Sequence, residues 1–217
     1  MTPIRDRAAF VRANTRVAPV PLVPEVRLHA ADDATELWAL TEADLDRSNL
    51  PPPFWAFAWA GGQALARFVL DNPDEVRGAR VLDFASGSGL VGIAAAMAGA
   101  GSVEAADIDG FALAAVALNA AENGVAVAAR GDDLVGRDEG WDAVLVADVF
   151  YERDTAGAVT PWLRSLARRG ARVIVGDPGR SYFDPTAFEL LAAYDVPVMR
   201  SLEDADVKRG GVWRVRG

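Results

Sequence analysis

The sequence predicts an α/β fold with a seven-stranded, mainly parallel sheet that ends in an antiparallel hairpin. From residue 80 onward, short apolar segments alternate with helical segments, which is typical of a parallel sheet covered by helices on both faces. The tail instead has two strand-like segments, 195–202 and 211–215, joined by a polar turn, which indicates an edge hairpin. The other strands are expected over residues 80–84, 103–106, 125–129, 142–147 and 172–176, with helices over 90–98, 111–123, 155–168 and 185–193.

The chain is expected to form one globular α/β unit with a small extension in front of it. The unit spans residues 51–217, and its first helix, over 61–70, ends at Asn72-Pro73 because proline cannot continue a helix. Residues 1–50 are expected to form the extension, a helix followed by a hairpin.

Proline spacing and alternation predict the elements of this extension. A helix is expected over 6–14, followed by a connector over 19–24 that its three prolines hold extended. Residues 26–30 alternate apolar and polar side chains and indicate a strand. The segment 36–40 is expected to pair with that strand as a hairpin.

Composition narrows the function classes. The 217 residues carry a formal net charge of −9, which argues against a nucleic-acid substrate, because phosphate binding needs a basic face. Acidity favours a basic partner instead. The chain has no cysteine and a single histidine, His29, so disulfides and thiolate metal sites are excluded and no metal centre is expected. We expect a monomer.

Cellular location is constrained only by the absence of a long apolar run. No segment is long enough to span a membrane. The arginines of residues 1–17 weakly resemble those of a mitochondrial transit peptide, but a short helix is the preferred interpretation. The expected location is the bacterial cytoplasm, or the mitochondrial matrix if the source is eukaryotic.

A glycine loop after the first strand of the α/β unit points to a nucleoside ligand. Its pattern is Asp83-x-Ala85-x-Gly87-x-Gly89, and a helix starts directly after it. Small residues let the backbone approach a ligand, and a helix start offers unpaired N–H groups. Asp83 would repel a pyrophosphate but suits the cationic groups of S-adenosylmethionine. The loop resembles the class I methyltransferase glycine motif, with Ala85 at a usual Gly, which implies a Rossmann-like fold and S-adenosylhomocysteine as product.

Acids after the next two strands are expected to bind the rest of the nucleoside. Asp107 ends the second strand and is suited to hold two ribose hydroxyls. Asp109 is better explained as the N-cap of the following helix. One of Asp132 and Asp133, after the third strand, is expected to accept from the adenine amino group, and the other to lie in a solvated turn.

The acid after the fourth strand is the candidate for the transfer chemistry. Ligands of open α/β sheets bind at the carboxyl ends of strands, so Asp148 and Tyr151 should face the reacting methyl group. We expect Asp148 to accept a hydrogen bond from an incoming amine and Tyr151 to shape the pocket. The alternative is that Asp148 caps the helix that begins near Thr155.

An aromatic, proline-rich segment lies upstream of the glycine loop. Trp55, Phe57 and Trp59 have no charged neighbours and suit a wall around a sulfonium or alkylammonium group, at about 0.5–2 kcal/mol per contact. Core packing is the alternative for all three. We expect Trp59 to contact the ligand. For Trp55, ligand contact and core packing are equally compatible with the sequence.

The stretch from Pro52 to Leu65, followed by 70–73, resembles the lysine methyltransferases of the electron transfer flavoprotein β subunit. The resemblance covers most of the chain from about Pro24 onward. It continues through strings at strand ends and a late Val-Trp pair: Val81-Leu82-Asp83, Asp107-Ile108-Asp109, Asp148-x-Phe150-Tyr151, Gly176-Asp177-Pro178-Gly179-Arg180 and Val212-Trp213. Ala60 departs from the pattern, because the wider group commonly has Pro there.

This resemblance implies methylation of lysines near the recognition loop of the flavoprotein, which is the expected protein partner. It also implies that Asp148 and Tyr151 form the Asp-x-x-Tyr motif of the seven-β-strand methyltransferases. The residues expected at the donor are Trp59, Asp83, Ala85, Ser86, Gly87, Gly89, Asp107, Ile108, Asp132, Asp133 and Ala147. Those expected at the substrate are Trp55, Phe150 and Arg180. The alternatives are a methyltransferase for another protein or a small amine, and a non-catalytic interaction module.

Overall fold

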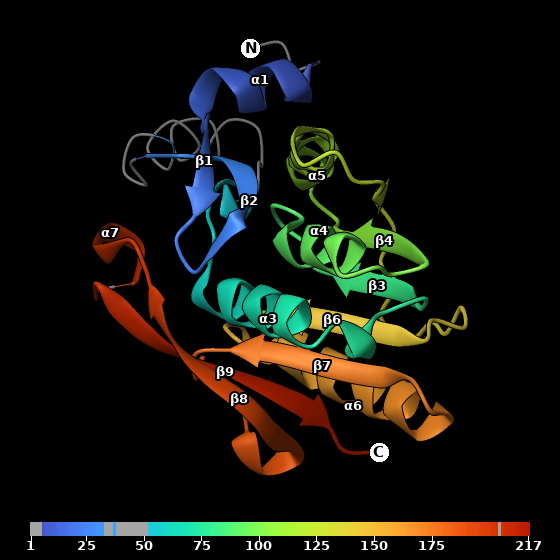
Figure 1. Ribbon diagram of the computed structural model, residues 1–217. Coiled ribbons are helices and arrows are strands. Elements are labelled where there is room, and N and C mark those ends of the chain that lie inside the picture. The colour runs from blue at the N-terminus through green and yellow to red at the C-terminus, as the bar shows by residue number, and fades with distance from the viewer. Residues whose placement is uncertain (1–5, 33–36, 38–51, 204) are drawn as a thin grey trace.

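A seven-stranded sheet with the strand order β5-β4-β3-β6-β7-β9-β8 forms the centre of the molecule (Figure 1). We describe it from a computed structural model, for residues 6–32, 37, 52–203 and 205–217. The strands from β5 to β7 are parallel, and β9 is antiparallel to both of its neighbours. Their bounds are β3 Arg80–Phe84, β4 Ser102–Ala106, β5 Ala128–Arg130, β6 Ala143–Ala147, β7 Arg172–Asp177, β8 Phe188–Pro197 and β9 Val207–Val215.

Helices cover both faces of this sheet, as the alternation of strands and helices predicts. On one face α3 (Ala60–Asp71) and α4 (Leu90–Met97) pack against Val81, Leu145 and Ile174. On the other face α6 (Arg153–Arg169) packs against neighbouring strand residues such as Leu82 and Val144. A fourth helix, α5 (Gly110–Glu122), follows β4. The mainly parallel α/β fold is confirmed.

The N-terminal segment forms a helix and a hairpin that pack beside α4 and α5. Helix α1 (Arg7–Asn14) agrees with the predicted helix over 6–14. Strands β1 (Arg16–Val20) and β2 (Val23–Ala30) pair antiparallel, so the extended connector predicted over 19–24 is wrong. Strand β2 pairs with the strand before it, and the partner predicted for it, 36–40, lies outside the described residues except for Leu37.

Asn119 of α5 and Asn123, the C-cap of that helix, join this hairpin to the α/β unit. The Oδ1 atom of Asn119 accepts a hydrogen bond from His29 N at 2.7 Å, and Oδ1 of Asn123 accepts one from Arg27 N at 2.9 Å. These bonds satisfy N–H groups of β2 that its partner strand does not pair. The predicted boundary at residue 50 falls outside the described residues.

The C-terminal part corrects two predictions. The helix predicted over 185–193 is a short 3₁₀ turn, Pro185–Ala187, followed by strand β8. The segment 195–202, predicted as a strand, ends in the short helix α7 (Arg200–Glu203). Residues 188–193 combine good helix formers with one apolar edge, and long antiparallel pairing with β9 overrides that local preference. The predicted C-terminal hairpin is present, with its first strand earlier in the chain.

Candidate active site

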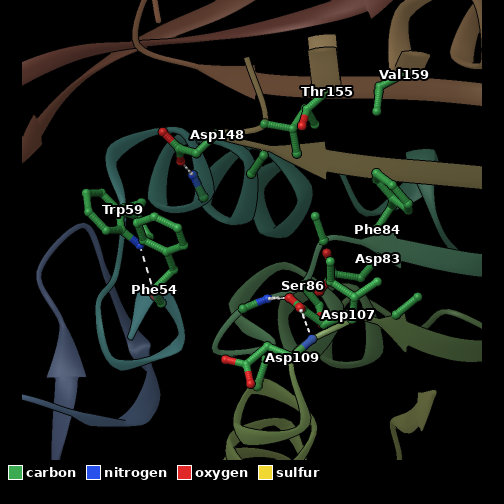
Figure 2. Close-up of a pocket in the computed structure, with 18 of the residues that line it drawn as sticks. Phe54, Trp59, Asp83, Phe84, Ser86, Asp107, Asp109, Asp148, Thr155 and Val159 are labelled. Carbon is green, nitrogen blue, oxygen red and sulfur yellow. Dashed lines mark hydrogen bonds between the residues drawn. The ribbon is translucent and has the colours of Figure 1, made fainter. Parts of the chain in front are cut away.

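A cavity of about 730 Å³ opens at the carboxyl ends of β3, β4 and β6 (Figure 2). In Figure 2, Asp83, Ser86, Asp107 and Asp109 lie toward one end of the cavity, while Phe54, Trp59 and Asp148 lie toward the other. Parallel strands present their carboxyl ends at one edge of a sheet, which is where open α/β sheets bind ligands. The cavity therefore has a carboxylate-lined end and an end that combines aromatic rings with a single acid.

The glycine loop turns sharply between β3 and α4. Its backbone has positive φ at Ala85 (53°), Gly87 (50°) and Gly89 (79°). Gly89 is the N-cap of α4, and the loop is closed by hydrogen bonds from Ser86 N to the Ala106 carbonyl and from Gly89 N to the Ser86 carbonyl. Ala85, Ser86 and Gly87 line the cavity. The loop thus places backbone against the cavity where a larger side chain would fill it.

Asp83 is hydrogen-bonded to the first turn of α4, the helix that follows this loop. Its side chain is buried, with the residue 2% exposed, and Oδ2 accepts a hydrogen bond from Gly92 N at 2.8 Å. Burial raises the pKa of Asp83 to about 8, although the Gly92 hydrogen bond acts in the opposite direction. A carboxyl group with this pKa exchanges its proton near neutral pH and would gain from a cationic ligand.

Asp107 organises the backbone around the cavity mouth. Its Oδ2 accepts from Gly87 N at 2.8 Å, and its Oδ1 accepts from Asp109 N at 2.9 Å (Figure 2). Burial raises the pKa of Asp107, while these hydrogen bonds lower it. Asp109 accepts from Phe111 N at 2.8 Å and caps α5, which confirms its predicted N-cap role. The neighbouring Ile108 is 81% exposed at the edge of the cavity.

Asp132 and Asp133 both line the cavity, and each already has a partner. Asp132 Oδ2 accepts from Arg130 Nη2 at 2.9 Å, whereas Asp133 Oδ1 accepts from Val135 N at 3.0 Å. The geometry leaves both acids as candidates for an adenine amino group.

Asp148 is held by three donors at the other end of the cavity. Its Oδ2 accepts from Gly62 N at 2.8 Å, and its Oδ1 accepts from Arg180 Nη2 at 2.7 Å and Nε at 3.1 Å. Burial raises the pKa of Asp148, and the charge of Arg180 opposes that shift. The N-cap of α6 is Glu152, so Asp148 does not cap that helix.

Asp148 adopts an uncommon backbone conformation. Its φ is 55°, in the left-handed region, and its N–H donates to the Gly176 carbonyl at 3.0 Å. Such strain persists only where the surroundings hold it, and it is concentrated at functional sites. The strained turn directs the carboxylate to the first turn of α3.

Aromatic side chains line this end of the cavity. Trp59 Nε1 donates to the Phe54 carbonyl at 2.9 Å, and the ring of Phe54 lies 5.8 Å from that of Trp59 and 5.5 Å from that of Tyr151. Phe57 also lines the cavity, and Tyr151 is 50% exposed at its mouth. The predicted aromatic wall is therefore made by Phe54, Phe57, Trp59 and Tyr151.

Two residues predicted for the substrate pocket lie in the core and do not line this cavity. Trp55 is 2% exposed and stacks on Phe111 at 6.2 Å. Phe150 is 1% exposed and packs edge-on against Phe183 and Phe188. Both predictions are corrected, because sequence alone does not show which aromatic residues of these short segments face the core.

The contact between Glu203 and Arg180 is not indicated by any motif in the sequence. Glu203, at the end of α7, accepts hydrogen bonds from Arg180, which also lies 5.4 Å from the Trp59 ring. It directly follows the segment 195–202 predicted as a strand, at the start of the polar turn expected there, but its side chain is 3% exposed. Only the folded chain brings it to Arg180.

Neither a metal-binding cluster nor a membrane-spanning helix is found in the described part of the chain. Residues 6–32, 37, 52–203 and 205–217 hold no group of three or more His, Cys, Asp or Glu side chains that could bind a metal ion. Within the same ranges, no helix has the length and apolarity to cross a membrane.

Comparison with known proteins relates the sequence to methyltransferases. It is 37% identical to the electron transfer flavoprotein beta subunit lysine methyltransferase of Xenopus laevis, over 94% of this chain and 85% of that protein. The rat protein of the same name is 35% identical, over 94% of this chain and 82% of the relative. Residues 64–152 match the family model of ribosomal protein L11 methyltransferase (PrmA).

Solved structures show the same fold at low sequence identity. Magnesium protoporphyrin IX methyltransferase from Synechocystis PCC 6803, solved with bound S-adenosylmethionine, aligns with a TM-score of 0.53 at 16% identity, covering 100% of both chains. A ribosomal protein L11 methylase from Lactobacillus delbrueckii aligns with a TM-score of 0.50 at 21% identity, covering 70% of this chain and 77% of that one.

Proposed function

The chain belongs to the family of electron transfer flavoprotein β-subunit lysine methyltransferases, and from this premise we propose that it methylates lysine side chains of that β subunit. The donor is S-adenosylmethionine, and the product is S-adenosylhomocysteine. The observation that carries the proposal is the position of Asp148, a firmly held acid in the same cavity as the glycine loop. One cavity thus offers a place for a donor and a place for an amine.

The residues at the first end of the cavity fit the donor in size and chemistry. About 730 Å³ lies within the range of roughly 300–1,000 Å³ typical of small-molecule sites. The small side chain of Ala85 and the backbone of Gly87 leave room for an aminoacyl chain. Asp83 would face its ammonium group, and that positive charge would favour the ionised form of the Asp83 carboxyl, whose pKa burial raises. In this proposal Asp107 binds the ribose hydroxyls and Ile108 contacts the adenine face, and both line the cavity.

The residues at the second end fit a lysine side chain. S-adenosylmethionine supplies an electrophilic methyl group when bound. The rings of Trp59 and Tyr151 line a partly apolar entrance that favours an alkyl chain with a cationic or neutral amine at its tip. Asp148, at the end of β6, accepts a hydrogen bond from that amine and so directs the nitrogen lone pair toward the donor site. Positioning is the main contribution.

The amine must lose a proton before it attacks. A free lysine has a pKa near 10.4, and partial burial beside the Arg180 guanidinium lowers the pKa of an amine bound at Asp148. Asp148 is neutralised by Arg180, so it orients the amine without strongly stabilising its charged form. We assign proton removal to water at the half-exposed Tyr151 side of the entrance.

Charge supports a lysine-bearing protein as the partner. The chain has a net charge of −9, and Glu152, Asp132 and Asp133 line the cavity mouth. An acidic surface of this kind steers a basic segment toward the entrance, and this attraction weakens with salt. The rate of methylation at low substrate concentration is therefore expected to fall as ionic strength rises.

A labelled-donor assay separates this proposal from its rivals. Purified flavoprotein and a cell lysate are each incubated with the protein and radiolabelled S-adenosylmethionine. Label on the flavoprotein β subunit supports the proposal, whereas label only on other bands supports a different substrate. Calorimetry addresses the third alternative, because a chain that does not bind the donor acts as an interaction module at most.

A further inference from the structure

Arg180 is fixed at both its backbone and its guanidinium. Its N–H donates to Asp177 Oδ1 at 2.7 Å, and its side chain is 17% exposed. The guanidinium donates from Nε and Nη2 to Asp148 Oδ1, as described above. The same group donates from Nη1 to Glu203 Oε2 at 3.1 Å and from Nη2 to Glu203 Oε1 at 2.7 Å. One cation is thus shared by two carboxylates from distant parts of the chain.

Glu203 is the more buried of those two acids. Its side chain is 3% exposed, compared with 11% for Asp148. Lys208 Nζ donates to Glu203 Oε2 at 2.6 Å, and Lys208 is the only lysine of the chain. Two acids and two bases therefore alternate as Asp148, Arg180, Glu203 and Lys208, and their formal charges cancel. Buried charges are tolerated when each is paired in this way.

We propose that Glu203 is a positioning residue for methyl transfer, because it holds Arg180 in the orientation that fixes Asp148. The inference rests on the proposed function, which assigns Asp148 to the incoming amine. Glu203 does not line the cavity, whereas Arg180 and Asp148 do, so Glu203 acts through Arg180.

The geometry of the guanidinium explains why a second carboxylate is needed. Asp148 alone contacts Nε and Nη2, which leaves rotation of the long side chain unopposed on its other edge. Glu203 engages Nη1 and Nη2 from that edge and keeps the plane of the group near Trp59. Without Glu203, we expect Arg180 to lose this orientation and Asp148 to lose a constraint on the carboxylate that meets the amine.

The substitution Glu203→Gln tests the orientation of Arg180 in the free protein. The Nε–H resonance of Arg180 is identified in a nitrogen-15 spectrum by its loss in Arg180→Lys. It should be sharp and protected in the wild type and lost or broadened in Glu203→Gln. The control is Glu75→Gln, which removes the charge from an ion pair of similar length with Arg214, more exposed and away from the cavity, and should leave the resonance unchanged.

Kinetics with saturating donor then connect the orientation to the reaction. Glu203→Gln should lower kcat for lysine methylation by about tenfold or more, because small misplacements of reacting groups are costly. The KM for the donor should stay unchanged. The double variant Glu203→Gln/Lys208→Met restores the balance of charge without restoring the bonds to Arg180, so its kcat should remain low.

Three results would overturn the inference: an intact Arg180 resonance in Glu203→Gln, a wild-type kcat for that variant, or full recovery of kcat in the double variant. If Glu203→Gln does not fold, Arg180→Lys replaces it, since lysine cannot bridge both carboxylates with a planar group and should lower kcat to a similar extent. A wild-type kcat in Arg180→Lys contradicts the inference. If the wild type methylates no lysine while the resonances behave as stated, the proposed function fails and the positioning of Arg180 stands.

Discussion

The backbone N–H of Gly62 donates to the carboxylate of Asp148 across 2.8 Å, which joins the first turn of α3 to the end of β6. A helix N-terminus stabilises a nearby anion, so this contact favours the ionised form of Asp148 against the effect of burial. The preceding Gly61 lies so close to β7 that a Cβ atom there would stand 2.4 Å from the Gly176 carbonyl oxygen. Gly61 thus sets how closely α3 approaches the acid, and Gly62 supplies the N–H that binds it.

Replacing each glycine by alanine separates close approach from helix propensity. A Cβ at position 61 would also lie 2.6 Å from Asp148 Oδ2, so Gly61→Ala should lower the free energy of unfolding by about 1–3 kcal/mol and reduce kcat. A Cβ at position 62 would meet nothing closer than 3.8 Å, so Gly62→Ala should be neutral or stabilising by up to about 1 kcal/mol. Thermal unfolding of both variants measures this, and equal changes would contradict the account.

Asp148→Asn should separate chemistry from donor binding. Asparagine tolerates the left-handed backbone at this position and can still accept from Gly62, so the fold should persist. Loss of the carboxylate should lower kcat for lysine methylation by about 100-fold. Donor affinity, measured by calorimetry, should remain at the wild-type value. A large loss of donor affinity would move Asp148 to the donor site.

Asp107→Asn is expected to act on the donor instead. The carboxylate accepts from Gly87 N and Asp109 N, and an amide cannot accept at both positions. A hydrogen bond to a charged group contributes about 1.5–3 kcal/mol, so the KM for the donor should rise by about tenfold or more. Asp109→Asn retains a capping side chain and should change that KM little. If Asp109→Asn has the larger effect, the ribose assignment belongs to Asp109.

Asp83 should make the stability of the fold depend on pH. Burial raises its pKa from 3.8 to about 8, so the folded state binds the proton more tightly than the unfolded chain does. The resulting stability is present below the unfolded pKa and is lost as pH rises toward 8. The Tm of Asp83→Asn relative to wild type should therefore increase between about pH 5 and pH 9. An unchanged difference in Tm would show that Asp83 ionises normally.

The two tryptophans should respond in different assays. Trp55 is buried against Phe111, so Trp55→Ala should cost about 3–5 kcal/mol of stability. Trp59 lies on the cavity near Arg180, so Trp59→Leu should raise the KM for the protein substrate with a smaller effect on Tm. Thermal unfolding and steady-state kinetics of both variants measure these effects. The reverse pattern would place Trp55 at the ligand.

Local patterns predicted the parallel half of the fold well. The buried strand before Gly87 and the helix after it are nearly continuous apolar runs with sharp boundaries, because both elements are buried in the centre of the fold. Residues 188–193 have no such signal, since β8 lies at an edge and its pairing with β9 depends on residues far along the chain. The β1–β2 hairpin is not predicted either, because the prolines of residues 19–24 indicate an extended connector where the two strands pair.

The site could be predicted only as far as neighbouring residues determine it. Asp83 lies near the end of β3, Asp107 and Asp148 directly follow β4 and β6, and strand ends converge at one edge of the sheet. The contact between Glu203 and Arg180 links two C-terminal segments whose arrangement depends on the sheet edge. The inward or outward direction of Trp55 depends likewise on packing against α1 and α5.

Mass spectrometry of the electron transfer flavoprotein β subunit, after incubation with this protein and S-adenosylmethionine, tests the central proposal most directly. The account predicts methyl increments on lysines of the β subunit with the wild-type protein and almost none with Asp148→Asn. An unmodified β subunit, in the presence of a wild-type chain that binds the donor, would contradict it.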